Sequence, residues 1–234
     1  MHKTALKLFM IPTVLADDTQ DQVLSPGVIS AIESLDIFFV ENVRTARRFI
    51  SSLRLGKVID ELTFIELNKD TPEAETYDAL KRLTRDAGVI SEAGCPGIAD
   101  PGAVAVNLAH QLGIQVVPLV GPSSILLALM ASGLSGQSFA FHGYLPIDKV
   151  QRKKMIQTLE RESRQRQQTQ LFMETPFRNN QLLDTLLETC QPDTMLSIAA
   201  DITAATEFLK TMPVRNWKSN KPDLHKRPVI FSIG

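Results

Sequence analysis

The segment Ser91–Gly102, SEAGCPGIADPG, combines glycine, proline and acidic residues in a pattern suited to holding a ligand. It follows a short apolar run that is typical of a buried strand and precedes a helical pattern. Glycine has no Cβ, so the main chain can approach a bound molecule closely. Ligands of open parallel sheets bind beyond the carboxyl ends of the strands. The segment is neither G-x-G-x-x-G nor a P-loop, so phosphate binding is not indicated. An ordinary tight strand–helix turn is the alternative.

A second segment of the same kind is Val120–Ser124, VGPSS, which also follows a strand and opens a helix. Ser123 is a candidate N-cap. Free N–H groups and the helix dipole at such a position favour an anionic group, such as the carboxylate of a cofactor. A plain capped helix start is the alternative.

The third segment, Glu41–Arg48, reads ENVRTARR and places a carboxylate ahead of three arginines at a strand end. Arginine binds phosphate and carboxylate groups in bidentate fashion. The segment therefore indicates an anionic substrate, or a solvated first helical turn with internal Glu–Arg pairs. Glu41 is also a candidate general base, together with Glu92 and Asp100 of the first segment. Asp100 could instead brace its own loop through nearby N–H groups.

The elements that must position these segments alternate along the chain. Strand-like apolar runs occupy Leu6–Ile11, Ile37–Val40, Phe64–Leu67, Gly88–Ser91 and Ile114–Val120. Helical patterns separate them at Gly27–Ser34, Arg44–Leu53, Pro72–Asp86 and Ala103–Leu112, with Thr71 as the candidate N-cap of the third. Such alternation predicts βαβ units and a parallel sheet.

After Val120 the pattern loosens. An apolar helix is expected at Ser123–Ser132, followed by strands at Phe139–Tyr144, Gln170–Glu174, Met195–Ala199 and Val229–Ile233. We therefore predict an α/β fold of two domains, with a boundary near Gly121–Pro122. Residues 1–120 would form an N-terminal α/β domain with a mostly parallel sheet, and residues 121–234 a smaller C-terminal α+β domain.

Composition limits the class of protein. Hydrophobic residues make up 44% and charged residues 22% of 234 residues, which is typical of a globular protein. No apolar run approaches the roughly 20 residues that span a bilayer, so no membrane segment is expected. Cys95 and Cys190 are far apart and form no ligand spacing, so no metal site is expected. The basic start of the chain leads into a strand rather than a signal peptide, and we expect a cytoplasmic protein.

The net charge of −1 gives no global case for nucleic acid, but basic residues gather locally. Lys149–Arg166 holds seven basic and two acidic residues, a surplus of five positive charges. Arg44–Lys57 and His225–Arg227 add two smaller groups. Basic residues on one face would favour RNA binding. A solvated polar helix is the alternative for the longest stretch.

Taken together, the three segments resemble the tetrapyrrole (corrin/porphyrin) methylase superfamily, and within it the branch of the ribosomal RNA small-subunit 2′-O-methyltransferase I type. That branch carries E-D-T-R-x-x-R-x, D-A-G-x-P-x-I-S-D-P-G, and V-P-G-P-S followed by A-S-G-L. This chain has ENVRTARR, EAGCPGIADPG and LVGPSSILLALMASGL in the same order. FAFHGYLP at Phe139–Pro146, TPFR at Thr175–Arg178, and Asp201–Thr203 with Glu207 resemble further family elements. The similarity runs from Leu8 to the C-terminus.

The resemblance implies S-adenosylmethionine, bound in a cleft between the two domains largely by main-chain contacts. The acceptor that it implies is a ribose 2′-hydroxyl of small-subunit ribosomal RNA, and the expected assembly is a homodimer. The residues it assigns to the cofactor are Glu92, Ala93, Gly94, Cys95, Pro96, Ile98, Asp100, Gly121, Pro122, Ser123, Ser124 and Thr203. Those expected at the substrate are Arg44, Arg47, Arg48 and Arg178.

The chain differs from the family at positions where a substrate would bind. The family loop P-T-P-I-G-N-L is replaced by Pro12–Asp18, PTVLADD, and the second carboxylate of E-D-T-R is Asn42. Ala204 and Thr206 replace a basic residue and a histidine. Two other functions therefore stay open: methylation of a tetrapyrrole or corrinoid, and a cofactor-binding module without catalysis. The Gly94–Pro96 sequence, G-C-P where the porphyrin branch has G-D-P, favours RNA.

Overall fold

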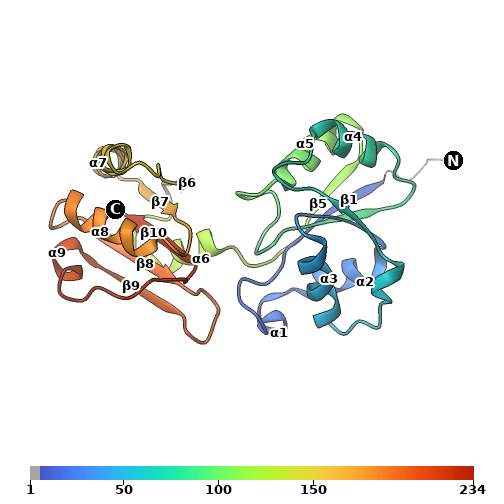
Figure 1. Cartoon of the computed structure of the whole chain (residues 1–234), viewed down its shortest axis with the longest axis horizontal. Helices are drawn as coiled ribbons and strands as arrows, with labels where there is room; N and C mark the ends of the chain where they lie inside the picture. Colours follow the sequence, from blue (N-terminus) through green and yellow to red (C-terminus); the bar gives the residue numbers. More distant parts are fainter. Residues whose placement is uncertain (1–5) are drawn as a thin grey trace. The chain divides into compact units, whose positions relative to one another are not determined.

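The computed structural model describes residues 6–234, and the basic start of the chain, residues 1–5, lies outside the described residues. The chain divides into two compact units, the first ending at Ser123 and the second beginning at Ser124 (Figure 1). Each unit is built around one five-stranded sheet. Within residues 6–234, no helix is long and apolar enough to cross a membrane.

The sheet of the first unit has the order β3-β2-β4-β1-β5, and all of its neighbouring strands are parallel. Its strands are β1 (Lys7–Ile11), β2 (Ile37–Val40), β3 (Thr63–Glu66), β4 (Ala87–Ile90) and β5 (Gln115–Pro118). Its helices are α1 (Gln20–Val23), α2 (Pro26–Ser34), α3 (Val43–Ser52), the 3₁₀ turn η1 (Ile59–Glu61), α4 (Glu73–Lys81) and α5 (Gly102–Gln111). The predicted parallel sheet is confirmed.

Helices cover both faces of this sheet. Helices α4 and α5 pack on one face, and α2 and α3 on the other (Figure 1). All four residues of β4 are buried, as expected for a central parallel strand with both faces covered. The carboxyl ends of β2, β4, β1 and β5 therefore form one edge, and the segments after them must lie next to one another.

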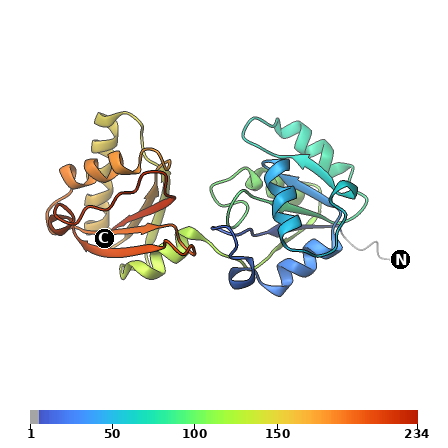
Figure 2. The ribbon, with the colours of Figure 1, turned by 60° about the horizontal axis from the view of Figure 1, so that its bottom comes forward.

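The second unit is a mixed α+β structure, as predicted. Its strands are β6 (Phe139–Tyr144), β7 (Thr169–Met173), β8 (Met195–Ala200), β9 (Phe208–Pro213) and β10 (Val229–Ile233). Its helices are α6 (Ser124–Ser132), α7 (Lys149–Arg166), α8 (Asn179–Thr189) and α9 (Val214–Trp217). The sheet order is β6-β7-β10-β8-β9, with β6 and β7 parallel and the other pairs antiparallel. Helices α7 and α8 pack on one face and α6 on the other (Figure 2).

The sequence-based prediction of α4 was wrong at both ends. The N-cap is Pro72, and the hydroxyl of Thr71 instead donates to the side chain of Asn68 at 3.2 Å. The helix ends at Lys81 rather than at Asp86. The Asp86 carboxylate accepts from the main-chain N–H of Lys7 at 2.8 Å, so this residue belongs to the turn that leads into β4.

The turn after β1 sits between the two glycine-containing loops of the first unit. Strand β1 lies between β4 and β5, so Pro12 and Thr13 leave the sheet between the loops that follow those strands. The N–H of Thr13 donates to the carbonyl of Gly94 at 2.9 Å. On the other side, a Cβ added to Gly121 would lie 2.2 Å from the Cβ of Pro12. Gly121 is therefore required by its neighbour in the fold, whatever it does for a ligand.

We expect Gly121→Ala to destabilise the protein by about 1–3 kcal/mol, because the methyl group overlaps Pro12 and the β1 turn must move. Gly136→Ala is the matched control, since no heavy atom lies within 4 Å of its added Cβ. Thermal unfolding of both variants checks the prediction. Equal melting temperatures for Gly121→Ala and Gly136→Ala would contradict it, because they would show that the β1 turn can move away from the added methyl group without loss of stability.

Candidate active site

Two of the three candidate carboxylates meet at the edge of the first sheet. Glu41 follows β2 and Glu92 follows β4, and these strands are neighbours. The main-chain N–H of Glu92 donates to Oε2 of Glu41 at 3.2 Å. The Asp100 carboxylate is close enough for its charge to act on Glu41. The structure thus brings Glu41 to the loop that carries Glu92 and Asp100, about 50 residues further along the chain.

Asp100 holds its own loop. Its Oδ1 accepts from the main-chain N–H groups of Gly97 and Gly102, at 2.7 Å each. Burial raises the pKa of Asp100, and these two hydrogen bonds oppose the rise. This geometry gives Asp100 a bracing task, which leaves Glu41 and Glu92 as the better candidates for proton transfer.

Glu41 has the properties of a proton acceptor. Burial raises its pKa most, and the nearby charges of Asp100 and Glu92 raise it further, while the hydrogen bond from Glu92 N–H lowers it. A carboxylate with a raised pKa is a stronger base at neutral pH than an ordinary glutamate. Perturbed carboxylates of this kind gather at active sites.

The two glycine-containing loops contact each other directly. The thiol of Cys95 lies 3.3 Å from the carbonyl oxygen of Pro122 and 3.7 Å from that of Gly121. Gly94 has a φ of +72°, and a Cβ on it would lie 3.2 Å from the Pro122 oxygen and 3.1 Å from Leu15. Glycine is therefore needed for both the backbone conformation and the close approach. Loops that the sequence placed at separate strand ends form one continuous surface.

The loop Ser91–Gly102 keeps several main-chain donors available. Its polar side chains largely serve the fold: the Ser91 hydroxyl bonds the Gly94 carbonyl at 3.1 Å, and Asp100 and Cys95 bond as described above. The N–H groups of Ala93, Cys95 and Ile98 donate to no other group in residues 6–234. A ligand at this loop would meet main-chain donors, which fits a cofactor held by the backbone.

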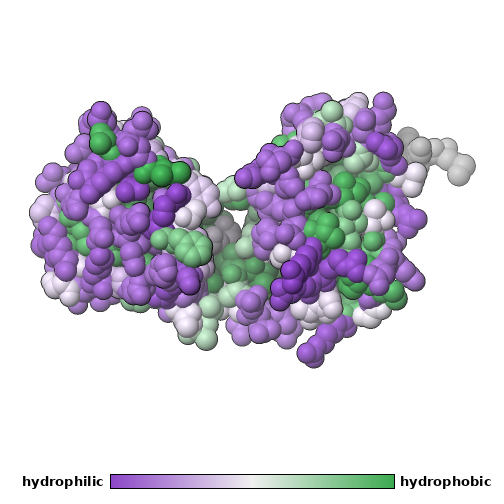
Figure 3. Space-filling model, in the orientation of Figure 1, coloured by the Kyte–Doolittle hydropathy of each residue, from purple (hydrophilic) through white to green (hydrophobic). Residues whose placement is uncertain are grey.

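Helix α3 carries the three arginines that the sequence assigned to substrate. Its N-cap is Asn42, whose Oδ1 accepts from the N–H groups of Arg44 (2.9 Å) and Thr45 (3.2 Å). The amide thus caps the helix where the family has an aspartate. Figure 3 shows strongly hydrophilic surface over this helix.

The three arginines differ in their partners. Arg47 forms an ion pair with Asp60, and its guanidinium lies 5.9 Å from the centre of the Phe64 ring. Arg44 and Arg48 form no ion pair with any part of the chain that the structure describes. These two are the arginines available to an anionic ligand.

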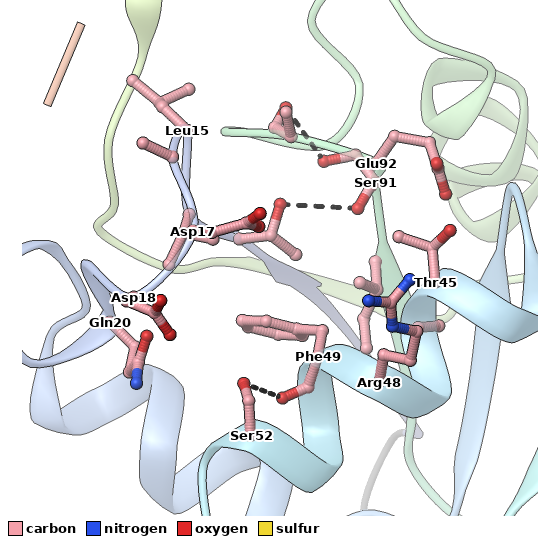
Figure 4. Close-up of a pocket in the computed structure, with 16 residues that line it drawn as sticks. Leu15, Asp17, Asp18, Gln20, Thr45, Arg48, Phe49, Ser52, Ser91 and Glu92 are labelled. Carbon is pink, nitrogen blue, oxygen red and sulfur yellow. Dashed lines mark hydrogen bonds between the residues drawn. The ribbon is translucent and has the colours of Figure 1, made fainter. Parts of the chain in front are cut away.

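A hollow of about 460 Å³ opens beside Glu92, at the ends of β1 and β4 (Figure 4). This is within the range of ligand sites. Its lining consists of the altered first loop, one face of α3 and the start of the glycine loop: Thr13, Val14, Leu15, Ala16, Asp17, Asp18, Gln20, Thr45, Ala46, Arg48, Phe49, Ser52, Ile90, Ser91, Glu92 and Ala93. The loop departure noted in the sequence therefore forms a wall of this hollow.

Sequence reasoning missed several side chains of this hollow, above all Asp17, Asp18, Gln20 and Phe49. A signal was present for two of them, because Asp17 and Asp18 replace uncharged residues of the family loop. Phe49 follows Arg48 and gave no separate signal, since an aromatic residue in a helix is usually part of the core.

The second unit holds the remaining predicted residues. Arg178 pairs with the fully buried carboxylate of Glu174 at 2.7 Å. Thr203 has a φ of +73°, and its N–H donates to Glu207 at 2.8 Å. They follow β7 and β8, which run the same way because both pair antiparallel with β10.

Four buried polar atoms near these two strand ends find no hydrogen-bond partner within residues 6–234. They are Glu174 Oε2, Arg178 Nε, Asn179 Oδ1 and Thr203 Oγ1. Unsatisfied buried groups in a folded protein call for a ligand or an ordered water. In the described chain, no group of three or more His, Cys, Asp or Glu is placed to hold a metal ion.

Fold and site together define an α/β protein with a ligand site at the carboxyl ends of parallel strands. Comparison with known families shows which family of α/β proteins the chain belongs to. The chain belongs to the family of tetrapyrrole (corrin/porphyrin) methylases, whose model matches residues 21–217. It is therefore a methyltransferase.

Individual relatives support this assignment. The chain is 25% identical to a ribosomal RNA small subunit methyltransferase I of Buchnera aphidicola, over 100% of this chain and 79% of the relative. It is 29% identical to the enzyme of that name from Vibrio cholerae, over 88% and 68%. Among solved structures, the uroporphyrin-III C-methyl transferase of Thermus thermophilus, complexed with S-adenyl homocysteine, shares the fold. That match has a TM-score of 0.56 and 13% identity and covers 97% of each chain.

We expect Glu41→Gln to leave the protein at least as stable as the wild type near neutral pH. A carboxyl group whose pKa is raised by folding costs stability once it ionises, and the amide removes that cost. The difference in stability between the two proteins should disappear as the pH falls below about 4.5, the ordinary pKa of glutamate. There the carboxyl group of Glu41 is neutral in both the folded and the unfolded state. Melting temperatures across this range check the sign, with Glu61→Gln on the turn η1 as the control. A wild type that is more stable at neutral pH would contradict it.

Replacing Asn42 by alanine should cost about 1 kcal/mol of stability, because two N–H groups of α3 lose their acceptor. Asn42→Asp should retain the stability, since aspartate caps as well and its charge suits the helix N-terminus. Denaturant unfolding of the two variants separates the cases. An alanine variant with wild-type stability would show that solvent replaces the cap without loss.

Proposed function

We propose that this methyltransferase transfers a methyl group from S-adenosylmethionine to a ribose 2′-hydroxyl of small-subunit ribosomal RNA. The observation that carries the proposal is the position of Glu41. This carboxylate has a raised pKa and is hydrogen-bonded to Glu92, which lines a hollow that also presents Arg48 and Phe49. A base, an anion-binding arginine and an aromatic ring are the groups that a nucleotide acceptor needs.

S-Adenosylmethionine, when bound, supplies a methyl group on a positively charged sulfur. The residues we propose for it are those of the two joined loops, Glu92–Asp100 and Gly121–Pro122, together with Ser123, Ser124 and Thr203. The available N–H groups of Ala93, Cys95 and Ile98 support this assignment, as does the unsatisfied hydroxyl of Thr203. A cofactor held in this way needs no charged signature in the sequence.

Methylation of a hydroxyl requires that its proton be removed as the new bond to carbon forms. Glu41 is the residue we propose for this task, with Glu92 beside it as the second carboxylate. Arg48 would bind the phosphate of the acceptor nucleotide and fix the orientation of its ribose. Arg44 and Arg178 remain proposed substrate residues. Arg47 is a weaker candidate, because it already forms an ion pair with Asp60.

A tetrapyrrole acceptor, which other members of the family methylate, is the second candidate. Its carboxylates would need the arginines of α3 as much as RNA phosphates would, so these side chains do not separate the two acceptors. The Gly94–Pro96 sequence, G-C-P where the porphyrin branch has G-D-P, favours RNA. The ribosomal RNA relatives point the same way. An RNA acceptor would place the protein in the cytoplasm, and the homodimer that the resemblance implies stays a prediction.

Purified protein, labelled S-adenosylmethionine and small ribosomal subunits that lack the modification test the proposal. We expect label in the RNA, at a position that becomes resistant to alkaline cleavage. Glu41→Gln should lower the rate of transfer by about 10²- to 10⁴-fold. Calorimetry should show cofactor binding unchanged in this variant, and Glu61→Gln should transfer at the wild-type rate.

Each alternative predicts a different result. Label in a tetrapyrrole and none in RNA would favour the small-molecule function. Tight cofactor binding with no transfer to either acceptor would favour a binding module without catalysis. Transfer by Glu41→Gln at the wild-type rate would remove Glu41 from the reaction and leave the acceptor assignment intact.

A further inference from the structure

A second hollow, of about 570 Å³, adjoins the first one. It lies among α1, α2 and the end of α3, and the two hollows share Gln20 and Ser52. We infer that together they form one groove that binds an extended segment of single-stranded RNA beside α3. This inference rests on the proposed RNA acceptor, and it extends the site to the nucleotide next to the acceptor.

The two walls of this groove carry opposite charge. The wall formed by the first loop and α1 presents Asp17, Asp18 and Asp21. The wall formed by α3 and its end presents Arg48 and Arg54. None of these five charges takes part in an ion pair within residues 6–234, so the walls stand apart instead of closing on each other.

This separation of charge orients a nucleic acid strand. Phosphates are drawn to the arginines and repelled by the aspartates, so the backbone would follow α3 with its bases turned toward the acidic wall. Carboxylates there accept hydrogen bonds from the N–H groups of bases. Arg48 lies within α3 and lines the first hollow, whereas Arg54 follows the end of that helix at Ser52 and lines the second hollow. They can therefore contact different phosphates of one strand.

Phe49 supplies the surface on which a base can stack. Its half-buried ring projects from α3 into the first hollow, toward the side of Asp18 and Gln20 (Figure 4). Base–aromatic stacking adds to the electrostatic attraction in single-strand sites, and it requires bases that are not already paired. A duplex does not offer such faces.

The second hollow suits the adjoining nucleotide. Its wall contains four apolar side chains, Leu24, Pro26, Ile29 and Leu53, with Arg54 beside them. Arg54 has a φ of +54°, the left-handed region that residues other than glycine and asparagine rarely adopt. The fold thus keeps this arginine among the residues that line the hollow, although its backbone conformation is uncommon for arginine.

Binding of a mixed-sequence single-stranded RNA oligonucleotide tests the groove, with fluorescence anisotropy measured over a range of salt. Arg48→Gln and Arg54→Asn should each weaken binding several-fold and lower the slope of log K against log salt by about 0.7. Asparagine tolerates the left-handed backbone at position 54. Phe49→Leu should weaken binding about fivefold or more and leave the slope unchanged. Arg82→Gln, at the exposed C-cap of α4 on the other face of the sheet, is the control for the loss of one positive charge.

The same strand annealed to its complement should bind the wild type more weakly than the single strand does. Melting temperatures verify that each variant is folded, and calorimetry verifies that each still binds S-adenosylmethionine. Equal affinity and equal salt slope for Arg48→Gln, Arg54→Asn and Arg82→Gln would overturn the groove, as would a preference for the duplex or no binding of the oligonucleotide.

Methyl transfer to small ribosomal subunits separates this inference from the proposed function. If the wild type labels the subunits and the groove variants label them equally well, the groove is wrong and the RNA acceptor stands. If the wild type labels no RNA, the proposed function itself fails.

Discussion

The hydrogen bond from Thr13 N–H to the Gly94 carbonyl, with Pro12 packed against Gly121, is the contact on which the site of the first unit depends. Strand β1 lies between β4 and β5, so its turn fixes the spacing of the loops that follow those strands. Cys95 then joins the two loops by its contact with Pro122. Because the hydrogen bond to Gly94 and the close approach to Gly121 both come from the turn after β1, the two loops cannot separate without moving that turn.

In this arrangement, side chains hold the two loops in place and main-chain N–H groups remain available to a ligand. Ser91, Cys95 and Asp100 hold the loops, and the main-chain donors of Ala93, Cys95 and Ile98 stay available to a ligand. The side chains left for chemistry come from neighbouring segments: Glu41 and Glu92 follow the adjacent strands β2 and β4, and Arg44 and Arg48 lie on α3. The altered first loop changes the wall that faces those arginines and leaves the contacts between the loops in place.

The strands were the most predictable part of the fold, because apolar runs bounded by turn residues determine them. Ile37–Val40, Phe139–Tyr144 and Val229–Ile233 match β2, β6 and β10 to the residue. Side-chain partners were not predictable, because they depend on how distant segments fold together. Arg47 was expected at the substrate and pairs with Asp60 of η1, and no local pattern places Asp18 and Phe49 in one hollow. The amphipathic helix α8 and strand β9 were also missed.

Residue-resolved hydrogen exchange, with and without saturating S-adenosylhomocysteine, tests the central claim most directly. The account predicts that the amides of Ala93, Cys95 and Ile98 exchange quickly in the free protein and become protected when the ligand binds. The Thr13 amide, already bonded to Gly94, should be protected in both states. Saturated binding that leaves those three amides as fast as before, or a Thr13 amide that exchanges freely, would contradict the account.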